Sequence, residues 1–327
     1  MISANLLQLN LLSPMVLAFF LGLLAVWAKS DLQLPEGLYA SLSMYLLLAL
    51  GLKGGAHLSQ TPFQVLWLPA FMTLLLGIGL PILGYNIAYF IGRFSQADSA
   101  ALAAHYGSVS VVTFMACEVF IDSLGISSEG YMAALVAILE IPGIIVALLL
   151  AECRQSETVS EQPLSLWYRL EGIIFSKSIL LLLGGLLIGC ISGKSGLERI
   201  APFFIDPFQG VLVLFMLDMG LVAGERLQDL KQVKVFLIIF AFFVPILNAM
   251  IGIYCGYLAG LSVGGSTVLG TIAASASYIA APAAVRVSIP DANPAYYLTS
   301  TIVLTFPFNL SLGIPLYYQF ACWVFKS

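Results

Sequence analysis

Two short segments rich in serine and glycine interrupt an otherwise apolar sequence. The first is GSVS at 107–110 and the second is SASY at 275–278. Such residues weaken a helix, and freed backbone groups at membrane depth are tolerated only where they face protein or a water-filled cavity. A half-helix that begins at a break presents N–H groups, which suit an anion, and one that ends there presents carbonyl groups, which suit a cation.

If the two breaks meet near the midplane, they form one small polar chamber that binds the ligand. The candidate wall residues of this chamber are Gly107, Ser108, Ser110, Thr113, Ser275, Ala276, Ser277 and Tyr278. The alternative is that the small residues serve only tight helix packing.

Carboxylic acids within apolar runs form a second group of candidates, because a buried charge in lipid is costly. Glu140 stands before Pro142, and at the matching place of the second half Thr305 precedes Pro307. Carboxylate, hydroxyl, amide and carbonyl oxygens are suitable ligands for a sodium ion. The ion-coupling candidates are Glu140, Thr305, Asn309 and Asp218, with a sodium ion expected at Glu140, Ser110 and Ser277.

Two of these acids also have a structural interpretation. Glu140 could instead be a protonated acid that forms hydrogen bonds within the helix bundle. For Asp218, structural bonding and a functional role are both open. Glu118 lies closer to the end of a span, near Asp122, and is not selected.

Catalytic and metal chemistry find little support in the sequence. The five cysteines and two histidines are scattered, without the spacing of a zinc site or a disulfide framework. We expect no metal beyond sodium, no other cofactor and no enzymatic activity, since no catalytic grouping or nucleotide-binding loop is present. The net charge of −4 argues against nucleic-acid binding.

The composition defines the elements that must position these residues. Of the 327 residues, 60% are hydrophobic and 9% are charged, and the mean hydropathy is +1.00. A lipid span needs about 20 mostly apolar residues. This length predicts an all-α polytopic membrane protein with ten spans, near 11–28, 37–52, 64–92, 98–121, 130–151, 172–192, 207–224, 233–259, 264–288 and 294–323. The first segment lacks the charged start of a signal peptide and is taken as a retained span.

The second half of the chain resembles the first. ALGLKGGAHL at 49–58 matches DMGLVAGERL at 218–227, so that Gly51 aligns with Gly220 at an offset of 169. In each half a serine segment follows, and then a segment that ends on a proline, Pro142 in the first half and Pro307 in the second. Five spans in each half force the second copy to be inverted. We therefore expect a first repeat at 1–151, a cytoplasmic linker at 152–171 and a second repeat at 172–327.

Orientation follows from lysine and arginine in the short loops. Nine of these residues fall on one side of the predicted spans and four on the other. The richer side is assigned to the cytoplasm, which places both termini outside. Arg286 and the turn IPDANP at 289–294 then mark the cytoplasmic end of the ninth span.

The chain resembles the sodium-dependent bicarbonate permeases of cyanobacteria and their relatives in other bacteria. The likeness covers almost the whole chain and is carried by HYGSVSVVTF, ILEIPG, LDMGLVAGERL, AASASYIAAPAAVRVSIPDANPAYY and PLYY. It implies ten spans with broken, crossing helices 4 and 9. Spans 3 to 5 and 8 to 10 would form a core domain, and spans 1, 2, 6 and 7 a gate domain.

The resemblance also implies a homotrimer in the bacterial cytoplasmic (inner) membrane that imports bicarbonate with sodium by moving the core against the gate. A small PII-like cytoplasmic regulator accompanies some members, although the linker at 152–171 is much shorter here than their loop. One departure concerns the site. Where the cyanobacterial pattern has an aspartate after the serine run, this chain has Tyr278.

The sequence thus predicts a secondary active transporter of a small anion, bicarbonate by resemblance, in symport with sodium. Two alternatives stay open. One is a proton-coupled transporter of another small anion or organic acid, with Glu140 as the proton carrier. The other is a membrane sensor that binds an anion without transporting it.

Overall fold

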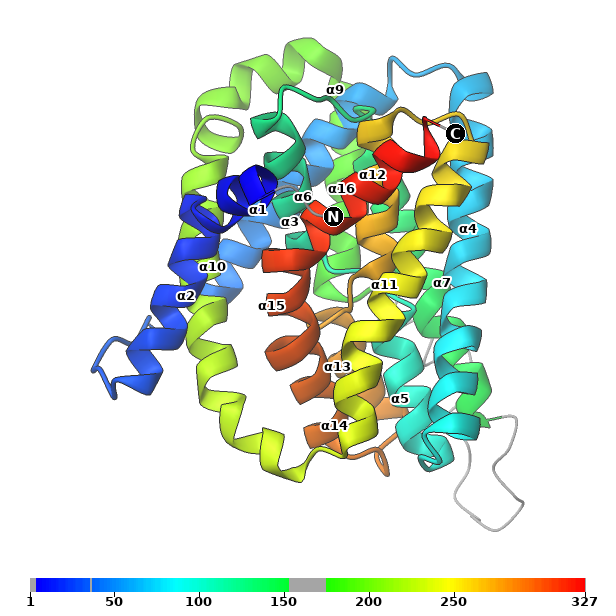
Figure 1. The fold of residues 1–327 in the computed structure, drawn as a ribbon. Coiled ribbons are helices and arrows are strands. Elements are labelled where there is room, and N and C mark those ends of the chain that lie inside the picture. The colour runs from blue at the N-terminus through cyan, green and yellow to red at the C-terminus, as the bar shows by residue number, and fades with distance from the viewer. Residues whose placement is uncertain (1–3, 36, 153–174, 327) are drawn as a thin grey trace.

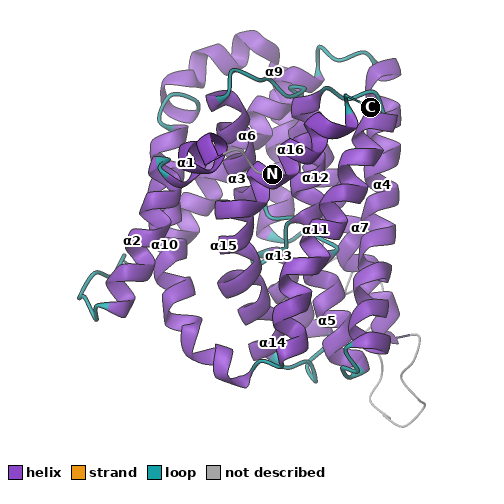
Figure 2. Cartoon of the chain, in the orientation of Figure 1, coloured by secondary structure: helices purple, strands orange, loops and turns teal. Residues whose placement is uncertain are grey.

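The computed structural model describes residues 4–35, 37–152 and 175–326, which form helices joined by short loops (Figures 1 and 2). These residues contain no β-strand. The predicted linker at 152–171 falls outside the described residues, apart from Glu152, the last residue of a helix. The prediction of an all-helical chain is confirmed for the described part.

Eight helical segments are long and apolar enough to cross a membrane. They are α3 (Leu38–Leu58), α4 with its π-helical end (Phe63–Ile91), α5 with α6 (Gln96–Ser123), α7 (Met132–Glu152), α9 (Lys177–Phe204), α10 with a 3₁₀ turn (Phe208–Gln232), α11 (Val235–Leu258) and α14 to α16 (Pro294–Val324). A ninth arises if α1 (Ala4–Leu11) and α2 (Pro14–Trp27), bent by 60° at their junction, count as one span.

The region of the predicted ninth span, 264–288, does not form one long helix. It consists of α12 (Val263–Ala274) and α13 (Ala280–Ser288), each too short to cross a membrane alone. The interruption falls on the serine segment at 275–278. Length alone therefore gives fewer spans than the ten predicted.

One predicted boundary is wrong. The second span was predicted to end at 52, but α3 continues to Leu58. Polar side chains such as Lys53 end the apolar run there, while the backbone stays helical because its hydrogen bonds need no lipid. The sixth span was predicted to end at 192, and α9 is interrupted at Gly193, where φ is 61° and ψ is −167°, before a further helical stretch to Phe204.

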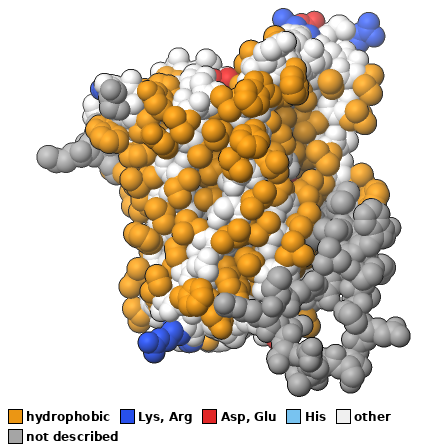
Figure 3. All heavy atoms as spheres, turned by 90° about the vertical axis from the view of Figure 1, so that its right-hand side faces the viewer, with side chains coloured by type: hydrophobic (Ala, Val, Ile, Leu, Met, Phe, Trp, Pro, Cys, Tyr) orange, Lys and Arg blue, Asp and Glu red, His pale blue; other side chains and the backbone are white. Residues whose placement is uncertain are grey.

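The outer surface is apolar over most of its height. Figure 3 shows hydrophobic side chains covering one face, with lysine and arginine side chains gathered at its upper and lower ends. Exposed large side chains such as Trp67, Ile188 and Phe243 belong to this surface. This distribution fits helices that face lipid between two aqueous layers.

Two helix pairs are joined by very close backbone contacts between glycines. α2 packs on α10, and a Cβ placed on Gly220 would lie 3.0 Å from the Cα of Gly22. α3 packs on α9, and a Cβ placed on Gly51 would lie 2.8 Å from the Cα of Gly185. Small residues at such contacts let helices associate tightly within lipid.

The remaining helices pack around the two serine segments. α4 lies against α5 and α7, and α11 lies against α12 and α16 (Ile314–Val324). In Figure 1, α6 (Val111–Ser123) and α12 lie in the upper half, and α5 (Gln96–Tyr106) and α13 lie in the lower half. Each serine segment therefore joins a lower to an upper half-helix.

Prolines within these helices free carbonyl groups that other helices satisfy. Pro245 has no N–H to donate to the carbonyl of Ala241, four residues earlier, and the hydroxyl of Thr305 donates to that oxygen instead (2.8 Å). Pro315 likewise frees the carbonyl of Ser311, which accepts from the side-chain amide of Asn10 on α1 (2.8 Å). These bonds explain why the polar side chains of Thr305 and Asn10 are buried between helices.

Candidate functional site

Both predicted helix breaks are present in the structure. α5 ends at Tyr106 and α6 begins at Val111, and Ser110 caps α6 by accepting from the backbone N–H of Thr113 (3.1 Å). In the second copy α12 ends at Ala274, and Ser277 accepts from the N–H of Ala281 in the first turn of α13 (3.1 Å). Serine is a favoured residue for this role because its oxygen replaces a missing helical acceptor.

The two breaks are hydrogen-bonded to each other. The N–H of Ser110 donates to the hydroxyl of Ser275 (2.8 Å), and the N–H of Ser277 donates to the carbonyl of His105 (2.8 Å). Ser275 in turn donates to the carbonyl of Ile272 (2.7 Å). Segments that are more than 160 residues apart in sequence therefore form one buried unit.

A neighbouring helix fixes the first break by close contact. A Cβ placed on Gly143 of α7 would lie 1.9 Å from the carbonyl oxygen of Gly107, and one placed on Gly107 would lie 2.5 Å from Pro81 of α4. The hydroxyl of Ser108 also faces the carbonyl of Glu140 on α7, at 3.4 Å. No side chain larger than hydrogen fits at Gly143 without displacing the break.

The carbonyl ends of the broken helices are capped by asparagine side chains. Asn309 donates to the carbonyl of Ala274 at the end of α12 (3.0 Å), and Asn248 of α11 donates to that of Tyr106 at the end of α5 (3.4 Å). Carbonyl groups that the sequence assigned to a cation are thus engaged by amides. Asn248 was not selected from the sequence, although an amide within the apolar run FVPILNAM is the kind of signal that could have identified it.

A small cavity of about 10 Å³ lies where the two breaks meet α7. Such a volume holds about one water molecule or one small ion. Its polar lining comes from Ser110, Ser277, Tyr278, Glu140 and Ser178, and its other lining residues are Leu47, Val109, Val111, Ile279 and Ala280. The structure therefore brings together four of the predicted site residues: Ser110, Ser277, Tyr278 and Glu140.

Two of these side chains carry unsatisfied polar atoms. Glu140 is 2% exposed, and its Oε2 has no hydrogen-bond partner among the described residues. The buried hydroxyl of Tyr278 also lacks one, while its ring packs edge-on against Phe306 (centroids 5.2 Å apart). Because buried polar groups are nearly always satisfied, these two atoms mark a place where a ligand, ion or water would bind.

Other predicted residues surround the cavity without lining it. Thr113 donates its hydroxyl to Ser110 (3.0 Å). Gly107, Ser108, Ser275 and Ala276 belong to the same buried breaks and supply the backbone and cross-links described above. They hold the segments that carry the lining residues in place.

Three predicted ion-coupling residues lie apart from this cavity. Thr305 bonds to Ala241 and, at 2.7 Å, to the hydroxyl of Tyr106, which is the donor because the single hydroxyl hydrogen of Thr305 goes to Ala241. Asn309 also accepts from Tyr317 (2.7 Å). Asp218, on α10, is 8% exposed, and its Oδ2 has no partner among the described residues. Ion binding by these three residues stays a prediction.

Six lining residues were missed by the sequence reasoning, and two of these, Leu47 and Ser178, belong to neither the breaks nor α7. Leu47 of α3 and Ser178 of α9 close the cavity from the side of the glycine-joined helices. A leucine within an apolar span carries no signal that could have identified it, whereas Ser178 is a polar residue at the start of a long apolar run. The cavity thus lies between two groups of helices.

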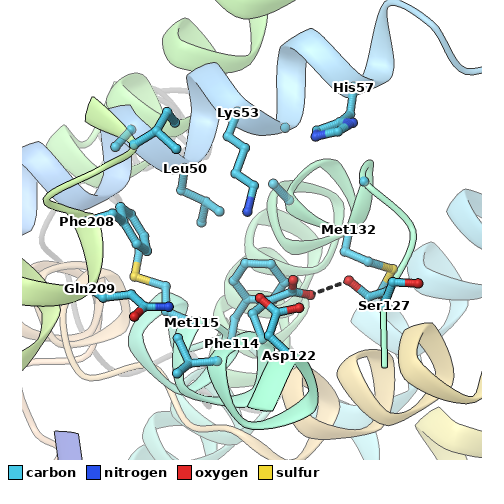
Figure 4. A pocket seen from close by; sticks show the side chains of 18 of the residues that line it. Leu50, Lys53, His57, Phe114, Met115, Asp122, Ser127, Met132, Phe208 and Gln209 are labelled. Carbon is cyan, nitrogen blue, oxygen red and sulfur yellow. Dashed lines mark hydrogen bonds between the residues drawn. The ribbon is translucent and has the colours of Figure 1, made fainter. Parts of the chain in front are cut away.

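A second, much larger cavity of about 430 Å³ lies further along α6 (Figure 4). Lys53 and His57 of α3 extend into it from one wall, and Phe114, Met115 and Asp122 of α6 form the wall opposite. The turn between α9 and α10 contributes Asp206, and the start of α10 contributes Phe208 and Gln209.

Comparison with known proteins identifies the family. The model of a family described as the Na+-dependent bicarbonate transporter superfamily matches residues 14–322, which span both breaks and all the cavity residues. The chain belongs to this superfamily. No curated protein matched the sequence.

Membership has direct consequences for the predictions. A transporter superfamily agrees with the expectation that the chain is not an enzyme, and it implies a small anion as substrate together with sodium. The apolar helices and the family together identify a multi-pass membrane protein. The resemblance stated from the sequence motifs is confirmed.

Proposed function

We propose that this chain is a secondary active transporter that imports bicarbonate together with sodium, and that both bind where the two helix breaks meet. One observation carries the proposal. Glu140 and Tyr278, each with a buried polar atom that lacks a hydrogen-bond partner among the described residues, line a buried cavity between the two broken helices together with Ser110 and Ser277.

The surroundings of this cavity suit ligands of both signs. Val111 and Ala280, the first residues of α6 and α13, line it, so two helix N-termini direct positive partial charge toward it. Glu140, when ionised, supplies a carboxylate for sodium, and the serine hydroxyls can turn to either ion. An anion and a cation bound side by side would neutralise each other within the membrane.

The small volume supports a mechanism in which the core moves. In the described conformation the cavity has room for about one water molecule, so bicarbonate and sodium cannot both enter. Leu47 and Ser178, on α3 and α9, form the wall that must separate from Glu140. We assign α2, α3, α9 and α10 to the gate and α4 to α7 and α11 to α16 to the core, and we propose an elevator-like movement of core against gate.

Contacts between the helices support the ten-span inverted repeat. The eight long segments, the bent pair of α1 and α2, and the interrupted pair of α12 and α13 add up to ten. Gly51, which the repeat aligns with Gly220, packs on Gly185 of α9, while Gly220 packs on Gly22 of α2. A two-fold relation that exchanges spans 1 and 2 with spans 6 and 7 converts one contact into the other.

The remaining predictions join the same proposal. The first and last described helices, α1 and α16, lie in the upper half of Figure 1, which we assign to the exterior. A homotrimer in the bacterial cytoplasmic membrane and an accessory PII-like regulator follow from the family resemblance.

Uptake into proteoliposomes tests the function. Purified protein should accumulate radiolabelled bicarbonate when an inward sodium gradient is applied, and replacement of external sodium by choline should abolish the accumulation. A pH gradient without sodium is the matched arm for the rival mechanism, in which Glu140 carries a proton. Accumulation driven by that arm alone would replace sodium coupling by proton coupling, and ligand binding without flux in either arm would revive the sensor.

A further inference from the structure

The larger cavity leads from one end of the protein toward the two breaks. Its deepest described lining residues on α6 are Phe114 and Met115, which are 3% and 1% exposed. They belong to the first turns of the helix that Ser110 caps. The floor of the cavity is therefore separated from the proposed binding site by about one helical turn.

The walls of this cavity come from both groups of helices. α3 and the turn between α9 and α10 contribute one side, and α6 and the start of α7 contribute the other. Its volume of about 430 Å³ far exceeds that of a single small anion. Such a space is suited to hydrated ions on their way to the site.

The acidic side chains that line this space are partly occupied by structural bonds. Glu118 accepts a hydrogen bond from Ser128 (2.6 Å), and Glu129 accepts one from the N–H of Ser262 at the start of α12 (2.7 Å). These bonds hold the loop between α6 and α7 in place. Asp122 and Asp206 are exposed at the rim.

Lys53 differs from these acids. Its side chain projects from α3 into the space, toward the wall that carries Asp122 (Figure 4). In the part of the chain that the structure describes, the one ion pair within 4.0 Å joins Arg226 to Asp229 (3.7 Å), so Lys53 has no carboxylate partner at that distance. It is the one lysine or arginine among the described lining residues.

We propose that the larger cavity is the entry vestibule of the transporter and that Lys53 binds the incoming anion there before it reaches the breaks. The inference rests on the proposed function, since it assigns a step that precedes binding at Ser110 and Ser277. The four carboxylates of the lining, Glu118, Asp122, Glu129 and Asp206, repel an anion, so the ammonium group of Lys53 is the described lining charge that can attract one.

Transport kinetics of two Lys53 variants test the proposal. Lys53→Gln should raise the KM for bicarbonate about threefold to tenfold, as expected for loss of one solvent-accessible charged contact, with Vmax and the half-saturating sodium concentration unchanged. Lys53→Arg, which keeps the charge, should stay within about twofold of the wild type. Arg199→Gln is the matched control, because Arg199 is exposed on α9 and does not line the cavity.

A different role for Lys53 would give a different pattern. If Lys53 instead closed the vestibule by pairing with Glu118 across it, Lys53→Gln would lower Vmax at constant KM. Glu118→Gln would copy that loss, and the exchange Lys53→Glu with Glu118→Lys would restore transport. That pattern, or an unchanged KM in Lys53→Gln, would overturn the proposal. Absence of sodium-driven uptake by the wild type would refute the proposed function itself. The wild-type measurement shows this independently of the Lys53 variants.

Discussion

Gly143 and Gly107 determine how closely α7 approaches the first break. Gly143→Ala would place a Cβ 1.9 Å from the carbonyl oxygen of Gly107, so the backbone must shift. We expect a loss of about 1–3 kcal/mol in the free energy of unfolding and impaired transport. Gly184→Ala is the control, because nothing lies within 4 Å of a Cβ at that helical position. Thermal unfolding of the two purified variants compares them, and equal stabilities would contradict the close contact.

Ser277 is expected both to stabilise the first turn of α13 and to act as a cavity residue. Ser277→Ala removes the acceptor for the N–H of Ala281, which costs about 1 kcal/mol of stability. If its hydroxyl also binds a ligand, bicarbonate affinity at saturating sodium falls as well, as titration calorimetry would measure. Ser41→Ala, at an exposed hydroxyl that bonds to the carbonyl of Gly37, should leave affinity unchanged. Unchanged affinity in Ser277→Ala would remove this residue from the site.

Individual site residues could be predicted from sequence only where their type was unusual for its surroundings. Serines in an apolar run and an acid before a proline identified Ser110, Ser277 and Glu140, which the structure places around one cavity. Leu47 could not be found, because its role depends on which helix faces the breaks. Thr305 and Asn309 had the expected chemistry, but tertiary contacts engage them in bonds to carbonyls that no local pattern reveals.

At the scale of helices, the bond from Thr305 to α11 should be important for stability. Thr305→Val leaves the carbonyl of Ala241, already freed by Pro245, without its donor and removes the acceptor of Tyr106. The expected cost is about 1–3 kcal/mol. Thr267→Val is matched in burial, but its hydroxyl bonds only to Val263 within the same helix, so the expected cost is below about 1 kcal/mol. Similar thermal unfolding of both variants would show that the bond between helices contributes little.

Helix existence was more predictable than helix ends. The apolar runs located all eight long apolar segments of the described residues, and the glycine and serine content located both breaks. The end of α3 was missed because the helix continues beyond the apolar run, where hydropathy no longer reports it. The bend between α1 and α2 depends on two features that a hydropathy pattern does not contain. Ser13 caps α2, and Asn10 donates to the carbonyl groups of Leu310 and Ser311, just before α16.

At the scale of the whole molecule, the inverted repeat predicts which loops face which side. Gln60→Cys, between α3 and α4, and Asp291→Cys, between α13 and α14, place thiols at exposed positions near opposite ends. In intact cells a membrane-impermeant thiol reagent should label Gln60→Cys, whereas Asp291→Cys should react only after permeabilisation. Each variant is compared with the unsubstituted chain, whose own cysteines set the background. Labelling of both positions in intact cells would contradict the ten-span topology.

The central claim is that Glu140, in the cavity between the two breaks, couples sodium to the anion. The most direct measurement compares sodium-driven bicarbonate uptake into proteoliposomes by the wild type, by Glu140→Gln, and by Glu198→Gln, a control at an exposed site on α9. We expect accumulation by the wild type and the control, and uptake no higher than in protein-free liposomes for Glu140→Gln. Sodium-driven accumulation by a folded Glu140→Gln variant at the rate of the wild type would contradict it.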